Sequence, residues 1–136
     1  MCLFIFLTVT SMGDLTPLIG EWKYVSLTVQ GKAVEVKKHR MVISKDGTIS
    51  IFEGETKVVA GRITRVDQKQ IDCILAARSE YDGRFAPEYP QEGIYEVTKT
   101  KWKMCRTRNA QAGPRPTEFA SPPNKDWVLE ELERVN

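Results

Sequence analysis

The sequence contains few of the residues that build metal centres or disulfide frameworks. Its 136 residues include one histidine and three cysteines, Cys2, Cys73 and Cys105, and no two cysteines form a C-x-x-C pair. A zinc site would need ligands gathered from distant strands, with His39 as the one imidazole. We therefore expect neither a metal nor another cofactor. Cys73 and Cys105 lie in strand-like runs and are either free, packed thiols or, in an oxidising compartment, a disulfide.

A large charge excess is also missing. Twenty Lys and Arg stand against eighteen Asp and Glu, a net charge of +2, which creates no long-range field that points to nucleic acid or to an acidic lipid surface. Along residues 99–103 the lysines alternate with Trp102, whereas a nucleic-acid barrel places basic and aromatic groups on one face. We therefore expect no nucleic-acid partner.

No apolar run is long enough to span a bilayer, so we expect no membrane span. The segment 2–9 (CLFIFLTV) is followed by small residues but preceded by no basic residue. It is either a signal remnant or an upstream leader, which we favour, or a first strand or packed tail. We assign residues 1–13 to this leader or tail and residues 14–136 to one domain, and we favour an exported location (periplasmic or extracellular) over a cytoplasmic one.

Catalytic motifs are absent as well. The chain has no G-x-S-x-G elbow, no H-E-x-x-H helix and no glycine-rich phosphate loop. Acids such as Asp46, Asp67 and Asp82 fall mainly in turns, where carboxylates commonly accept hydrogen bonds from the backbone. We therefore do not expect an enzyme.

Short β-branched and aromatic runs, separated by turn residues, follow from Gly20 onward. This spacing is typical of an antiparallel all-β sandwich or barrel. Asp14 can cap a short helical turn over residues 15–18, where Pro17 is tolerated. Long loops are expected at 78–91 and 107–126. The predicted strands cover residues 21–29, 41–44, 48–52, 56–66, 70–76, 93–98 and 101–106.

Three further features of these strands follow from the residue pattern. Strict alternation in the first strand places Trp22 and Tyr24 on one face and Val25 and Leu27 on the other. Gly61 is expected at a bulge or bend. The last segment, 127–135, suits either a helix or a closing strand, and we favour the strand because an open barrel would leave two unpaired edges.

The chain resembles a known family in several short segments. Gly20-Glu21-Trp22 is similar to the G-x-W signature of lipocalin-type barrels, and four further segments follow in order: Gln30–Lys32, Gly93–Glu96, Lys103–Cys105 and Arg115–Pro122. Together they resemble the small lipocalin-like domain abundant in planctomycete bacteria. The resemblance implies an all-β, eight-stranded antiparallel up-and-down barrel, frequently exported and without established catalytic residues. The pair Glu130-Glu131 departs from the family pattern, in which more apolar residues are expected.

Such a barrel has an interior that is either filled by side chains or occupied by one small ligand. Trp22 would plug its narrow end, with Arg134 packed over the indole ring. We predict non-enzymatic binding of a small apolar molecule in or at the mouth. The alternative is an interaction or structural module with a filled core, whose partner is another protein. The candidate lining and rim residues are Tyr24, Ile51, Ile63, Tyr81, Phe85, Tyr89, Tyr95 and Trp102.

Overall fold

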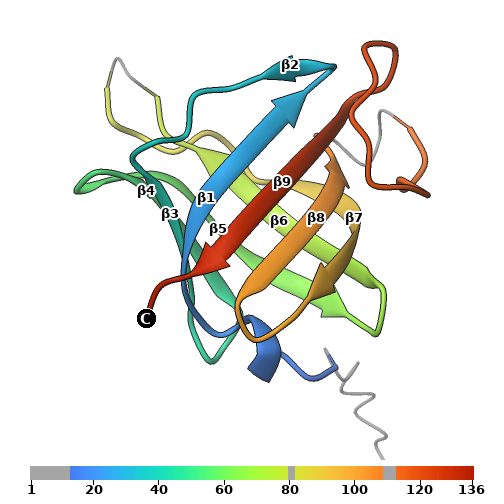
Figure 1. Ribbon diagram of the computed structural model, residues 1–136. Coiled ribbons are helices and arrows are strands. Elements are labelled where there is room, and N and C mark those ends of the chain that lie inside the picture. The colour runs from blue at the N-terminus through green and yellow to red at the C-terminus, as the bar shows by residue number, and fades with distance from the viewer. Residues whose placement is uncertain (1–12, 80–81, 109–112) are drawn as a thin grey trace, which may run out of the picture.

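The computed structural model describes residues 13–79, 82–108 and 113–136, which form one antiparallel sheet and a single 3-10 turn (Figure 1). No helix among them is long and apolar enough to cross a membrane. The predicted leader or tail, apart from Gly13, lies outside the described residues. The elements are η1 (Thr16–Leu18), β1 (Gly20–Val29), β2 (Lys32–Ala33), β3 (His39–Ile43), β4 (Thr48–Glu53), β5 (Thr56–Val66), β6 (Gln70–Ala77), β7 (Tyr89–Val97), β8 (Lys101–Thr107) and β9 (Trp127–Arg134).

Eight of these strands close into an up-and-down barrel. Neighbours in the order β1, β3, β4, β5, β6, β7, β8, β9 pair antiparallel, and β9 also pairs with β1, from Trp22 opposite Arg134 to Val29 opposite Val128. The predicted barrel is therefore confirmed, and so is the prediction that residues 127–134 form its closing strand rather than a helix. Closure gives both β1 and β9 a partner on each side over part of their length, which removes the long free edges of an open sheet.

The strand ends differ from the prediction by more than one residue in two places. β3 begins at His39, two residues early, and β7 begins at Tyr89, inside the segment expected to be a loop. Pro90 is tolerated there because β7 pairs with β6 alone at this point, and its pairing with β8 starts only at Gly93. The short β2 was not predicted; it forms a hairpin with β1 through Gln30 and Gly31, which both have positive φ.

Bulges change which residues face the interior. Tyr24 pairs with Leu132 but Ser26 with Glu131, so Val25 is an extra residue and its side chain is 50% exposed. The predicted strict alternation is therefore wrong beyond Tyr24, because the bulge turns Leu27 inward.

Gly61 was expected at a bulge or a bend, and the first of these is wrong. The register of β5 shifts on either side of it, at residues 58 and 64. A Cβ atom on Gly61 would lie 2.0 Å from the carbonyl oxygen of Ile74, so glycine is required because two strands approach closely.

The end of the barrel near η1, at the bottom of Figure 1, is closed and filled. Trp22 is fully buried and its ring lies edge-on to Trp102, with the centroids 5.5 Å apart. Leu18 of η1 covers this pair, and its carbonyl accepts a hydrogen bond of 2.9 Å from Trp22 Nε1. Asp14 accepts a hydrogen bond from the Thr16 backbone N–H at the start of η1, as a cap would. Further core residues of this half include Met41, Ile43, Ile49, Ile51, Ile63, Val66, Ile71 and Leu132.

Arg134 fastens the closed end. Its guanidinium carbon lies 4.2 Å from the centroid of the Trp22 ring. Its three nitrogens donate hydrogen bonds to the backbone carbonyls of Lys99, Ile19 and Pro17, at 2.7–2.8 Å. One side chain thus ties the β7–β8 turn and η1 to the end of β9.

Candidate ligand-binding site

A cavity of about 390 Å³ opens at the other end of the barrel, where β1, β6 and β8 end and β5, β7 and β9 begin. Seven of its eleven lining residues are aliphatic, and they come from strands that face one another across the barrel. The lining residues are Leu27, Val29, Val34, Val59, Leu75, Ala77, Tyr89, Gln91, Arg106, Arg108 and Val128.

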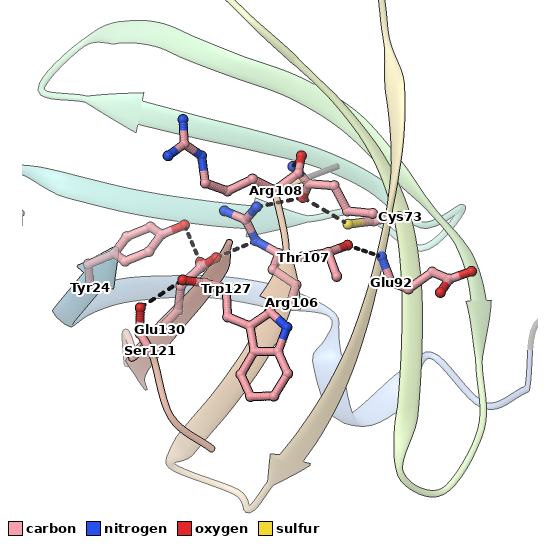
Figure 2. Close-up of polar contacts among 10 residues, drawn as sticks. Tyr24, Cys73, Glu92, Arg106, Thr107, Arg108, Ser121, Trp127 and Glu130 are labelled. Atoms are coloured by element: carbon pink, nitrogen blue, oxygen red, sulfur yellow. Dashed lines mark hydrogen bonds and ion pairs between the residues drawn. The ribbon is translucent and has the colours of Figure 1, made fainter. Parts of the chain in front are cut away.

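An ion pair lies at the base of this cavity. Glu130 is fully buried, and its carboxylate accepts hydrogen bonds from Arg106 Nε at 2.5 Å and from the Tyr24 hydroxyl at 2.9 Å (Figure 2). The three residues come from the adjacent strands β8, β9 and β1, so barrel closure brings them together. Removing either charge alone would leave the other buried without a counter-ion, which is strongly unfavourable.

Gln91 extends this network to β7. Its side-chain oxygen accepts a hydrogen bond of 2.5 Å from Arg106 Nη1, and its amide nitrogen donates to the backbone carbonyl of Arg108. The Cys73 thiol also donates to the Gln91 oxygen, at 3.8 Å. Gln91 is 4% exposed, so its position is fixed by packing as well as by hydrogen bonds.

The surroundings set the protonation of these groups. Burial, reinforced by the Glu130 charge, holds the pKa of Tyr24 well above its usual value. Burial likewise raises the pKa of Cys73 to about 12. Burial opposes the charge on Arg106, but the Glu130 carboxylate together with Cys73 and Tyr24 raises its pKa. At neutral pH the base of the cavity therefore holds a permanent guanidinium cation, a phenol and a thiol, all of them hydrogen-bond donors.

The rim is more open. Arg108 Nε lies 3.4 Å from Asp126 Oδ1, and both side chains are well exposed to solvent. Tyr89 is 40% exposed beside them. An exposed pair of this kind contributes little to stability.

The candidate lining and rim residues predicted from the sequence do not all lie at the cavity. Tyr89 lies at the rim of the cavity. Tyr24 does not line the cavity, but its hydroxyl donates to Glu130, the ion-pair partner of Arg106. Ile51, Ile63 and Trp102 are packed in the core of the closed half and do not line the cavity.

The other nominated residues lie elsewhere. The Tyr95 hydroxyl donates to the carbonyl of Asp67, and its ring packs against the same closed-half core. Phe85 is 41% exposed on the segment between β6 and β7 and does not line the cavity. Tyr81 lies outside the described residues. Trp22 and Arg134 lie at the closed end, in contact with each other.

Sequence reasoning missed Arg106, Gln91 and Glu130. A signal for two of them was present. Arg106 continues the inward face of Trp102 and Met104 at a spacing of two, and Glu130 lies between Val128 and Leu132 on the inward face of β9. A charged residue on the buried face of a strand calls for a buried partner.

The two described cysteines are free. Cys73 points into the barrel, whereas the Cys105 thiol donates to the carbonyl of Ala120 in the segment that crosses the outer face. They lie on opposite faces of the sheet, so the disulfide left open by the sequence does not form. Among the residues that the structure describes, no group of three or more His, Cys, Asp or Glu side chains could hold a metal ion.

Comparison of the chain with protein-family models, with curated proteins and with solved structures finds no match in any of the three.

Proposed function

We propose that this chain is a lipocalin-like binding domain that holds a small, mainly apolar molecule in the cavity at its mouth and does not transform it chemically. The observation that carries the proposal is the cavity itself, which is walled by aliphatic side chains above a filled core. The segments that resemble the planctomycete lipocalin-like domain support the same interpretation, and we propose that the chain belongs to that group of exported domains.

The cavity sets the size of the ligand. A volume of about 390 Å³ lies at the small end of the range for ligand pockets. The Arg106–Glu130 pair and the packed core below it stop a ligand from entering further. Burial of about 200 Å² of apolar ligand surface would contribute about 5 kcal/mol before the cost of association. We therefore expect weak binding, with dissociation constants of about 0.1 mM or above.

A neutral fluorescent dye, N-phenyl-1-naphthylamine, tests the proposal. We expect its fluorescence to rise on binding and to saturate at one dye per chain. In Ala77→Trp the new indole fills the cavity, so dye binding should be lost while the thermal unfolding transition remains.

Ala60→Trp is the matched control. It makes the same change on the adjacent strand, on the outer face between the inward residues Val59 and Gly61, and it should bind dye as the parent protein does. Absence of saturable binding to the parent protein would overturn the proposal and favour the alternative, an interaction or structural module.

A further inference from the structure

Arg106 has one unused hydrogen-bonding nitrogen. Its guanidinium carries five N–H donors; Nε donates to Glu130 and Nη1 to Gln91. Within residues 13–79, 82–108 and 113–136, no group accepts a hydrogen bond from Nη2, and Figure 2 shows this nitrogen without a dashed line.

This nitrogen is accessible from the cavity. Arg106 lines the cavity and its side chain retains 13% exposure. Among the described residues, the fully buried side-chain atoms without a hydrogen-bond partner belong to His39, Asp72 and Trp102. Nη2 has no partner either but is not one of these buried atoms, so it is accessible to solvent. A ligand that displaces water from Nη2 must replace the lost hydrogen bond.

The charges around the cavity are balanced. Arg106 is matched by Glu130 at 2.5 Å, and Arg108 by Asp126 at 3.4 Å. A carboxylate bound to Nη2 would share one guanidinium with the buried Glu130 carboxylate. Two like charges at such a site disfavour each other. A neutral carbonyl oxygen accepts the same hydrogen bond without that repulsion.

We infer that the mouth selects apolar molecules with an uncharged, carbonyl-bearing head group, such as an amide, an ester or a ketone, over the corresponding carboxylates. The carbonyl oxygen accepts from Arg106 Nη2, and the aliphatic body packs against Leu27, Val59, Leu75 and Val128. This inference rests on the proposed function and names the chemical class of its ligand.

The test compares two ligands that differ only at the head group, octanamide and octanoate, at pH 7.5. Each is titrated against the full chain loaded with N-phenyl-1-naphthylamine. We expect octanamide to displace the dye at a concentration about tenfold lower than octanoate. Equal potency, or stronger displacement by octanoate, would overturn the inference. Failure of the dye to bind in the first place would overturn the proposed function instead, so the two failures are distinguishable.

Glu130→Gln sharpens the test. The amide oxygen can still accept a hydrogen bond from Tyr24 or Arg106, but the charge that opposes a carboxylate is gone. We expect octanoate affinity to rise about tenfold relative to octanamide. Glu131→Gln is the control, because Glu131 points outward toward Lys103 and Ser26, and it should leave the preference unchanged.

The double variant Arg106→Met/Glu130→Gln removes both charges of the pair. It should still bind dye but should not distinguish the two head groups. A double variant that retains the preference for octanamide would contradict the role of Arg106. The comparison on the parent protein remains decisive if either variant fails to fold.

Discussion

The two ends of the barrel each depend on one arginine, and the two arginines are used differently. At the closed end, all three nitrogens of Arg134 donate to backbone carbonyls and the guanidinium lies over Trp22. At the mouth, Arg106 has two nitrogens bound by side chains and a third that no described residue binds. A guanidinium whose three nitrogens all donate to main chain acts as a structural clamp. We propose that one with a free nitrogen beside a cavity recognises a ligand.

The partners of the two arginines differ in energetic terms as well. Arg134 brings a charge to neutral carbonyls at a partly exposed position, where solvent shares the task of stabilising it. Arg106 is held beside Glu130, which has no exposure at all. A buried pair adds little net stability compared with apolar residues, but it is costly to break from one side. Arg134 therefore acts as a clamp at the closed end, whereas the role that we propose for Arg106 at the mouth is selectivity.

Arg106→Met tests the mouth and should have the largest effect. It leaves the Glu130 carboxylate buried without its cation, so we expect the free energy of unfolding to fall by about 3–5 kcal/mol. Urea denaturation followed by tryptophan fluorescence measures this loss. Adding Glu130→Gln to the same chain should recover most of it. A loss below about 1 kcal/mol in the single variant would mean that Arg106 does not compensate Glu130.

How much of this could be predicted from sequence depends on the residues concerned. The range of β5 and the closing strand β9 were predicted because alternation and turn residues are local properties. The bulge at Val25 was not, because strict alternation was assumed across the adjacent apolar residues Tyr24 and Val25. The extra residue is established only by the register with β9. Because the bulge was missed, the inward position of Leu27 was not predicted either.

The candidate site was harder to predict than the fold. In the sequence, Glu130 was interpreted as a departure from the family pattern, and Arg106 was interpreted as the last residue of a strand. Charged residues on strands usually face solvent, so neither suggests a buried partner by itself. Only closure of the barrel, which places β8, β9 and β1 side by side, shows that these two residues and Tyr24 form one network.

Arg134→Met tests the clamp at the closed end and should have a smaller effect. The variant loses three hydrogen bonds and the contact with Trp22, but its carbonyl partners lie near the surface and can bind water. We expect a loss of about 2 kcal/mol, measured by the same urea titration. Dye binding at the mouth, at the opposite end of the barrel, should be unchanged. Loss of dye binding in a folded Arg134→Met protein would show that the two ends are not independent.

The smallest effect concerns Cys73, which reports on whether the base of the mouth cavity is closed. Its pKa of about 12 means that the thiolate, the reactive form, is almost absent at neutral pH. Between pH 7 and 9 we expect iodoacetamide to label Cys73 at least about a thousandfold more slowly in the native chain than in 6 M urea, read by peptide mass spectrometry.

The same pKa fixes the sign of the pH dependence. Because folding raises the pKa of Cys73, the neutral thiol contributes stability that is complete below about pH 9 and is lost as the pH rises toward 12. Cys73→Ala should lack this part of the alkaline loss. Equal labelling of Cys73 in native and unfolded chains would show that the network of Gln91, Arg106 and Glu130 opens readily, and the mouth could not then hold a preorganised head-group site.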